Sequence, residues 1–192
     1  MDIERRYFET ELKIETRDDK QKRIVGHGAV FNSFSENLGG FREIILPGAF
    51  DDVLTNDVRA LFNHNSDKIL GRTKSNTLAL KVDQKGLYYE IIPPETSYAN
   101  DLLTSLERGD ITQSSFSFNV DKQNWKEDDE GRVVREIIKV KRLYDISPVT
   151  FPAYPEADSD VAKRGFQDYL KSKEPIKDSE KERIELRIKN KN

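Results

Sequence analysis

The most informative segment of the chain reads Gln113-Ser114-Ser115-Phe116-Ser117-Phe118-Asn119-Val120. Its polar and apolar residues alternate with a period of two, which is typical of a β-strand that has one face in the core. Ser114 and the two phenylalanines share one face, whereas Ser115 and Ser117 share the other. The pattern therefore predicts that Ser114 is buried, and that the Ser115 hydroxyl lies on a polar face where a substrate could reach it.

Other alternating segments lie on both sides of this stretch, and most of them are short. Gly26 and Gly28 interrupt one segment, which indicates a bulge or a close approach of another backbone segment. A helical pattern with three leucines at residues 102–106 ends at Gly109, a typical helix terminator. The sequence predicts an α+β fold: an antiparallel-rich β-barrel core, closed or nearly closed, with peripheral helices.

The composition changes after Pro155, and this change divides the chain. Residues 158–170 keep a helical pattern, but from Lys171 onward most residues are charged or polar. The residues from Lys171 onward have too few apolar side chains to offset the roughly 1–2 kcal/mol of backbone entropy that each ordered residue costs. We therefore expect one folded domain over residues 1–157. Residues 158–192 are expected to form a charged tail, helical or disordered, and the part after about Lys171 is expected to be mobile or held only by a partner chain.

Composition also excludes several functions. The 192 residues contain no cysteine, which excludes disulfides, thiol catalysis and Cys-ligated metal sites. The net charge of −3 mixes both signs and gives no case for a nucleic-acid partner, because nucleic-acid-binding surfaces are basic. No segment reaches the ~18 apolar residues of a membrane span, and residues 1–6 lack the apolar run of a signal peptide. We expect a soluble protein of the cytoplasm that needs no cofactor.

Catalysis by a serine hydroxyl needs a base, and the chain has two histidines, His27 and His64. An imidazole takes the serine proton, and an acid beside the imidazole fixes its tautomer. His64 follows the apolar segment 58–63, and Asp145 lies inside another apolar segment. These positions predict a triad of His64, Ser115 and Asp145. Each position also has a non-catalytic interpretation. His64 is then a polar residue at the end of a strand, and Asp145 is a buried acid that pairs with an arginine. No G-x-S-x-G motif is present, which argues against an α/β-hydrolase.

Six short motifs follow one another along the chain. They are GAVFN at 28–32, EIILPGAF at 43–50, LFNHN at 61–65, LGRT at 70–73, SFSF at 115–118 and LYDISPVTFPAYP at 143–155. Together they resemble the prohead protease family of tailed phages. These are capsid-maturation serine proteases with a fold like that of the herpesvirus assemblin proteases.

The resemblance implies a role for each candidate residue. The catalytic histidine of the family falls on His64, its serine on Ser115 and its acid on Asp145. Assemblin-type enzymes use a second histidine as the third member of the triad, and His27 is the only candidate for that role here. The family often has glycine at the position of Ser117, which implies a tolerated small residue rather than a second nucleophile.

The resemblance also implies a serine endopeptidase that acts inside the immature capsid, in the cytoplasm of a bacterial host. Its expected substrates are the scaffold protein or the scaffolding segment of the major capsid protein, and the protease itself. The charged tail would serve for incorporation into the capsid or be removed by self-cleavage. Self-association is expected, and a nucleic-acid or membrane partner is not.

Two other interpretations remain open. The first is a non-catalytic capsid-assembly or scaffolding protein that has the same β core and charged tail but no working nucleophile. The second is a metal-dependent hydrolase built on His27, His64 and acidic residues. The second is the weaker one, because the chain contains neither H-E-x-x-H nor H-x-x-E-H.

Overall fold

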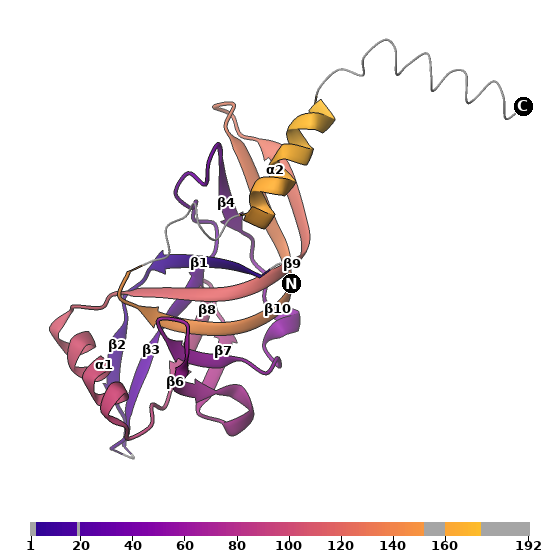
Figure 1. Ribbon diagram of the computed structural model, residues 1–192. Helices are drawn as coiled ribbons and strands as arrows, with labels where there is room; N and C mark the ends of the chain where they lie inside the picture. The colour runs from indigo at the N-terminus through magenta and orange to yellow at the C-terminus, as the bar shows by residue number, and fades with distance from the viewer. Residues whose placement is uncertain (1–2, 19, 152–159, 174–192) are drawn as a thin grey trace, which may run out of the picture.

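The computed structural model describes residues 3–18, 20–151 and 160–173 (Figure 1). Strands dominate these ranges, as the alternating segments predict, and they form two sheets. The first sheet has the order β1-β9-β10-β5-β6, and β4 pairs with another part of β10. Its strands are β1 (Glu4–Glu9), β4 (Phe41–Ile45), β5 (Arg59–Phe62), β6 (Asn65–Arg72), β9 (Gln113–Glu127) and β10 (Val133–Val149).

The second sheet has the order β2-β3-β8-β7, and all of its pairings are antiparallel. Its strands are β2 (Lys13–Thr16), β3 (Lys22–Val30), β7 (Leu78–Val82) and β8 (Gly86–Ile91). The two sheets share one hydrophobic core, in which Phe116 and Phe118 of β9 lie with Tyr89 of β8.

The expected closed barrel is not present among the described residues, which corrects the sequence-based expectation. The first sheet ends at β1 on one side and at β6 on the other, so its hydrogen-bonded ladder does not close. The physical reason lies in β10, which pairs in parallel with β4 through its first residues and with β5 through its last. One long strand that changes partner along its length extends a sheet instead of closing it.

Gly28 shows how closely the two sheets approach each other. A register shift between His27 and Ala29 marks a bulge in β3 at this glycine. A Cβ atom at Gly28 would lie 2.2 Å from the Cδ1 atom of Ile146 in β10. The predicted bulge is therefore confirmed, whereas the atoms that approach Gly28 belong to side chains and not to another backbone.

Two α-helices and two short 3₁₀ helices complete the described part of the chain. The predicted leucine helix is α1 (Ser97–Arg108), and it ends at Gly109, whose φ of 80° is left-handed. The 3₁₀ helices are η1 (Asp51–Val53) and η2 (Thr73–Ser75). No helix in the described ranges is long and apolar enough to cross a membrane.

The second α-helix, α2 (Asp160–Lys173), lies beside the long β9–β10 hairpin in Figure 1. Its Phe166 ring stacks on Trp125 at 5.9 Å between ring centroids and also contacts Phe41, so α2 belongs to a small second core. The helix begins within the predicted tail, but residues 152–159 and 174–192 lie outside the described ranges. The division at residue 157 and the behaviour of the charged end therefore stay predictions.

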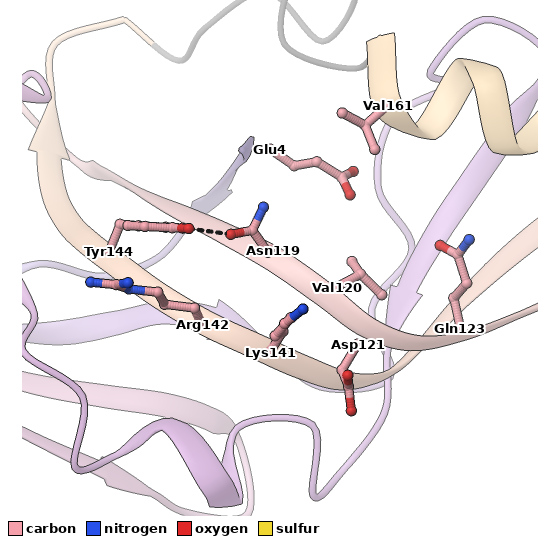
Figure 2. A pocket seen from close by; sticks show the side chains of 9 residues that line it. All are labelled: Glu4, Asn119, Val120, Asp121, Gln123, Lys141, Arg142, Tyr144 and Val161. Carbon is pink, nitrogen blue, oxygen red and sulfur yellow. Dashed lines mark hydrogen bonds between the residues drawn. The ribbon is translucent and has the colours of Figure 1, made fainter. Parts of the chain in front are cut away.

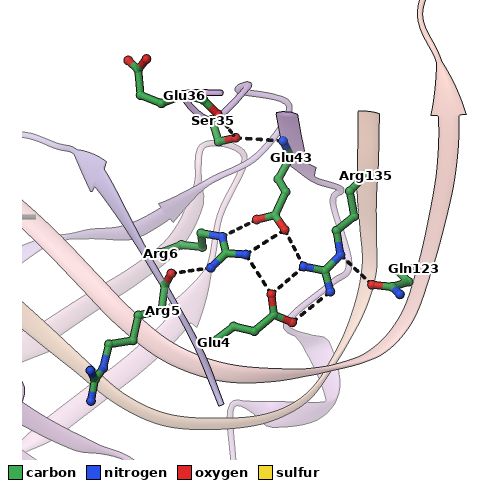
Figure 3. Close-up of polar contacts among 8 residues, drawn as sticks. All are labelled: Glu4, Arg5, Arg6, Ser35, Glu36, Glu43, Gln123 and Arg135. Carbon is green, nitrogen blue, oxygen red and sulfur yellow. Dashed lines mark hydrogen bonds and ion pairs between the residues drawn. The ribbon is translucent and has the colours of Figure 1, made fainter. Parts of the chain in front are cut away.

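Four buried charged side chains join β1, β4 and β10 (Figure 3). They are Glu4, Arg6, Glu43 and Arg135, none of them more than 7% exposed. Each arginine bonds to both glutamates, so the charges cancel within the cluster. Burial alone would raise the pKa of Glu43, but the charges and hydrogen bonds of Arg6 and Arg135 outweigh burial and lower it. The cluster ties β1 to β4 and β10.

Candidate active site

Ser115 and Ser114 lie on opposite faces of β9, as the alternation predicts. The Ser114 hydroxyl is fully buried and lies 2.7 Å from the Tyr89 hydroxyl, in the core between the sheets. Burial raises the pKa of the Tyr89 hydroxyl, and its hydrogen bond with Ser114 opposes this only in part. Ser115 faces the other way, between Tyr7 on β1 and Ser147 on β10.

The polar face is not open at Ser115, which is only 2% exposed. This differs from the expected accessible hydroxyl, and the reason is tertiary. The side chain of His64, which lies in the turn between β5 and β6, bonds to the Ser115 hydroxyl. The sheet order places β5 beside β10, the strand next to β9, and so brings this turn within reach of Ser115.

His64 occupies a tight two-residue turn between β5 and β6, where Phe62 pairs with Asn65. Asn63 and His64 have φ values of 54° and 55°, as the type I′ hairpin turn requires. Asparagine and histidine tolerate this left-handed conformation better than most residues do. The pair Asn63-His64 is therefore suited to turn the chain sharply and to present the imidazole at the end of the hairpin.

The structure brings the three predicted residues together. The Nε2 atom of His64 lies 2.7 Å from the Ser115 Oγ atom, and its Nδ1 atom lies 2.5 Å from the Asp145 Oδ1 atom. The side chains of His64 and Asp145 are each 12% exposed, so little water competes for these bonds. A hydroxyl, an imidazole and a carboxylate in this order can activate the hydroxyl as a nucleophile.

Asp145 is stabilised as a carboxylate. Burial alone would raise its pKa, but the hydrogen bond and charge of His64, together with hydrogen bonds from Ser117 and Ser147, lower it below its usual value. An ionised Asp145 accepts a hydrogen bond from the Nδ1–H group of His64, and this tautomer leaves Nε2 able to take the Ser115 proton.

Two further hydroxyls support this carboxylate and imidazole. Ser147 is fully buried, donates to the Asp145 Oδ1 atom at 2.9 Å and lies 3.3 Å from His64 Nδ1. The Ser117 hydroxyl lies 3.4 Å from the same nitrogen and accepts from the Nε atom of Arg5. The sequence predicted only a small residue at Ser117 and no role for Ser147. Ser147 is two residues after Asp145 in a strand, and this spacing, which places both side chains on one face, was the signal available.

A β-bulge gives Asp145 its orientation. Leu143 pairs with Phe118 and Asp145 pairs with Ser117, so Tyr144 is an extra residue in β10. In a regular strand Leu143 and Asp145 would share a face, because they are two residues apart. The bulge instead leaves Leu143 in the core, fully buried, and turns Asp145 toward His64.

His27 is not part of this arrangement. It lies on β3 in the second sheet, and its Nε2 atom is 2.9 Å from the Asp83 Oδ2 atom. The Nδ1 atom of His64 already faces Asp145, so the structure gives the third position to the carboxylate rather than to His27. The two histidines that a shared metal site would need thus have separate partners. Among the described residues no group of three or more His, Cys, Asp or Glu side chains could hold a metal ion.

Comparisons with known proteins show which family the chain is similar to. The family profile described as caudovirus prohead serine protease matches residues 10–172, a range that includes all three residues. The protein called prohead protease of Enterobacteria phage HK97 is 36% identical over 156 residues, which cover 79% of this chain and 64% of that protein. The chain thus spans less than two thirds of that relative's length.

One solved structure, described as the bacteriophage T4 capsid assembly protease, is similar over 77% of this chain and 98% of its own. The two share 9% sequence identity with a TM-score of 0.43.

Proposed function

The chain belongs to the caudovirus prohead serine protease family, and from this membership we propose that it is a serine endopeptidase of capsid maturation. One observation carries the proposal: the His64 imidazole bonds to the Ser115 hydroxyl through one nitrogen and to the Asp145 carboxylate through the other. This is the arrangement that activates serine in proteases of several unrelated folds.

In the proposed reaction, Ser115 Oγ attacks the carbonyl carbon of the scissile peptide while His64 Nε2 takes the hydroxyl proton. The imidazolium that forms is stabilised by the Asp145 carboxylate, which accepts a hydrogen bond from its Nδ1–H group. His64 then gives the proton to the leaving amine, and the C–N bond breaks to leave an acyl ester on Ser115. Water activated by the same imidazole hydrolyses the ester and restores the hydroxyl.

The proposed substrates are the scaffold protein or the scaffolding segment of the major capsid protein, together with the protease itself. The name of the HK97 relative, prohead protease, supports a place inside the immature capsid in the cytoplasm of the bacterial host. Residues 1–157 would form the protease domain. Residues 158–192 would form the segment used for incorporation or removed by self-cleavage, and copies of the chain would associate within the capsid.

Co-expression with the proposed substrate, the major capsid protein, followed by intact mass measurement of all fragments, tests the proposal. We expect fragments of the capsid protein and of the protease in the wild type and none with Ser115→Ala. Fragments that persist with Ser115→Ala would favour the rival interpretation, a non-catalytic assembly protein acted on by another protease. The fragment masses would also report the cleavage sites directly.

A fluorophosphonate probe tests the chemistry without a substrate. The probe reacts with an activated serine, and peptide mapping after labelling identifies which one. We expect the label on Ser115. Label on Ser114 or Ser117 would contradict the assigned nucleophile, and an active enzyme without label would contradict serine catalysis.

A further inference from the structure

A cavity of about 560 Å³ lies along the β9–β10 ladder, beyond the three candidate catalytic residues (Figure 2). Resting on the proposed function, we propose that this cavity is a substrate subsite that binds an acidic side chain, about four residues from the peptide bond that is cut. The residues that line it are Glu4, Asn119, Val120, Asp121, Gln123, Lys141, Arg142, Tyr144 and Val161.

The cavity lies on the same two strands as the triad, a few residues further along each of them. Asn119 is on the same face of β9 as Ser115 and Ser117, because the three alternate along the strand. On β10, Tyr144 adjoins Asp145, and its hydroxyl donates to the Asn119 side chain, as Figure 2 shows. A peptide that leaves Ser115 along this face therefore reaches the cavity directly.

Two bulges in β10 turn side chains into the cavity wall. Val140 pairs with Val120 and Arg142 pairs with Asn119, so Lys141 is an extra residue, just as Tyr144 is in the next bulge. Both extra residues line the cavity. Bulges re-aim side chains and are frequent beside active sites. The two bulges place the Lys141 ammonium group and the Tyr144 hydroxyl in the cavity wall, where a regular strand would not place them.

The charges of the lining favour an anion. Lys141 and Arg142 are exposed, and within the described ranges neither forms an ion pair. The guanidinium of Arg142 rests over the Tyr144 ring at 4.8 Å. Glu4 is neutralised by Arg6 and Arg135.

Figure 2 shows the Lys141 amine pointing into the cavity and the Asp121 carboxylate pointing away. A carboxylate from a bound peptide would thus gain charge-assisted hydrogen bonds without displacing an existing partner of Lys141.

The distance between Ser115 and the cavity sets the position of the acidic residue in the bound peptide. Ser115 and Asn119 are four residues apart on β9, about 13 Å at the rise of a strand. An extended peptide spans the same length with about four residues. The acidic side chain is therefore expected three to five residues from the scissile bond, on one side of it only.

Cleavage of a diverse peptide library, read by mass spectrometry, tests the inference without knowledge of the natural substrate. For the wild type we expect Asp and Glu to be enriched at one position in that window. Lys141→Glu and Arg142→Glu should each lower this enrichment by about tenfold, the effect of losing one charge-assisted hydrogen bond. Preferences next to the scissile bond should not change. Lys85→Glu, an exposed lysine in the turn before β8, is the matched control and should keep the wild-type profile.

Labelling by the fluorophosphonate probe, measured on each variant, separates a changed subsite from a damaged enzyme, because a variant with an intact triad still takes the label. Lys141→Gln provides a milder substitution that removes the charge without reversing it. Absence of both cleavage and label in the wild type overturns the proposed function and this inference with it. A labelled wild type without acidic preference in the window overturns this inference alone. So does a preference that survives in Lys141→Glu and Arg142→Glu.

Discussion

The side chain of Asn63 is hydrogen-bonded twice to Thr150: its Oδ1 atom accepts from the Thr150 amide at 2.8 Å, and its Nδ2 atom donates to the Thr150 Oγ1 atom at 3.2 Å. The Asn63 amide also donates to the Pro148 carbonyl at 3.0 Å. These bonds fasten the turn that carries His64 to the end of β10, the strand that carries Asp145. The base and the acid are thus positioned by one and the same strand.

The first prediction concerns this fastening. Asn63→Gly keeps the left-handed backbone accessible but removes both side-chain bonds, so His64 should lose its fixed position. Because small misplacements of catalytic groups are costly, we expect kcat to fall by about 10- to 100-fold with little change in KM. Asn76→Gly is the matched control, since Asn76 has the same left-handed conformation at φ 56° in another turn. Unchanged kcat in Asn63→Gly would show that Asn63 does not position His64.

The second prediction concerns the nucleophile and its base. Ser115→Ala and His64→Ala should each lower kcat by on the order of 10⁴ to 10⁶, and the double variant should lose little more, because the two act as a unit. Ser114→Ala should change the rate only modestly, since Ser114 bonds to Tyr89 in the core. Steady-state kinetics on one cleaved peptide checks all four variants. Losses that multiply in the double variant would contradict a shared catalytic role.

The third prediction assigns the acid. Asp145→Asn removes the charge that stabilises the His64 imidazolium, and we expect kcat to fall by about 10² to 10⁴. His27→Gln should leave kcat within a few-fold of the wild type, because His27 bonds to Asp83 in the other sheet. Activity should also persist in excess chelator. A large loss in His27→Gln together with a mild one in Asp145→Asn would reverse the assignment.

The fourth prediction follows from the lowered pKa of Asp145. A carboxyl whose pKa is lower in the folded chain stabilises the fold above its unfolded pKa of about 3.9, and this stabilisation is lost as the pH falls through the folded value. The free energy of unfolding of the wild type, measured by urea denaturation, should therefore decrease as the pH falls below about 4. Asp145→Asn should show a shallower decline over this pH range. Identical declines would mean that Asp145 does not contribute to the acid sensitivity.

The fifth prediction concerns the buried charge cluster. Arg135→Met leaves Glu4 and Glu43 buried with only Arg6 as their common partner, which should lower the free energy of unfolding by about 3–5 kcal/mol. Arg132→Met, at an exposed ion pair with Asp128 on the β9–β10 hairpin, should leave the unfolding midpoint nearly unchanged. Urea denaturation of both variants measures the difference. A stable Arg135→Met would mean that the cluster does not hold β1 in place.

The sequence determined the local features, because they depend on neighbours along the chain. The period of two in residues 113–120 separated Ser115 from Ser114, and the structure confirms their opposite faces. The leucines before Gly109 predicted α1 and its end. The short motifs around His64, Ser115 and Asp145 identified three side chains that the structure brings within hydrogen-bond distance.

Only the tertiary structure decided how distant strands meet. Alternation does not reveal which strand pairs with which, so it suggested a barrel where β10 divides its length between β4 and β5 in a two-sheet fold. Alternation also does not reveal a bulge. The extra residue Tyr144 turns Asp145 toward His64, and the extra residue Lys141 contributes to the cavity wall. Pairing and register depend on contacts between residues far apart in the chain, and these contacts exist only once the sheets have packed together.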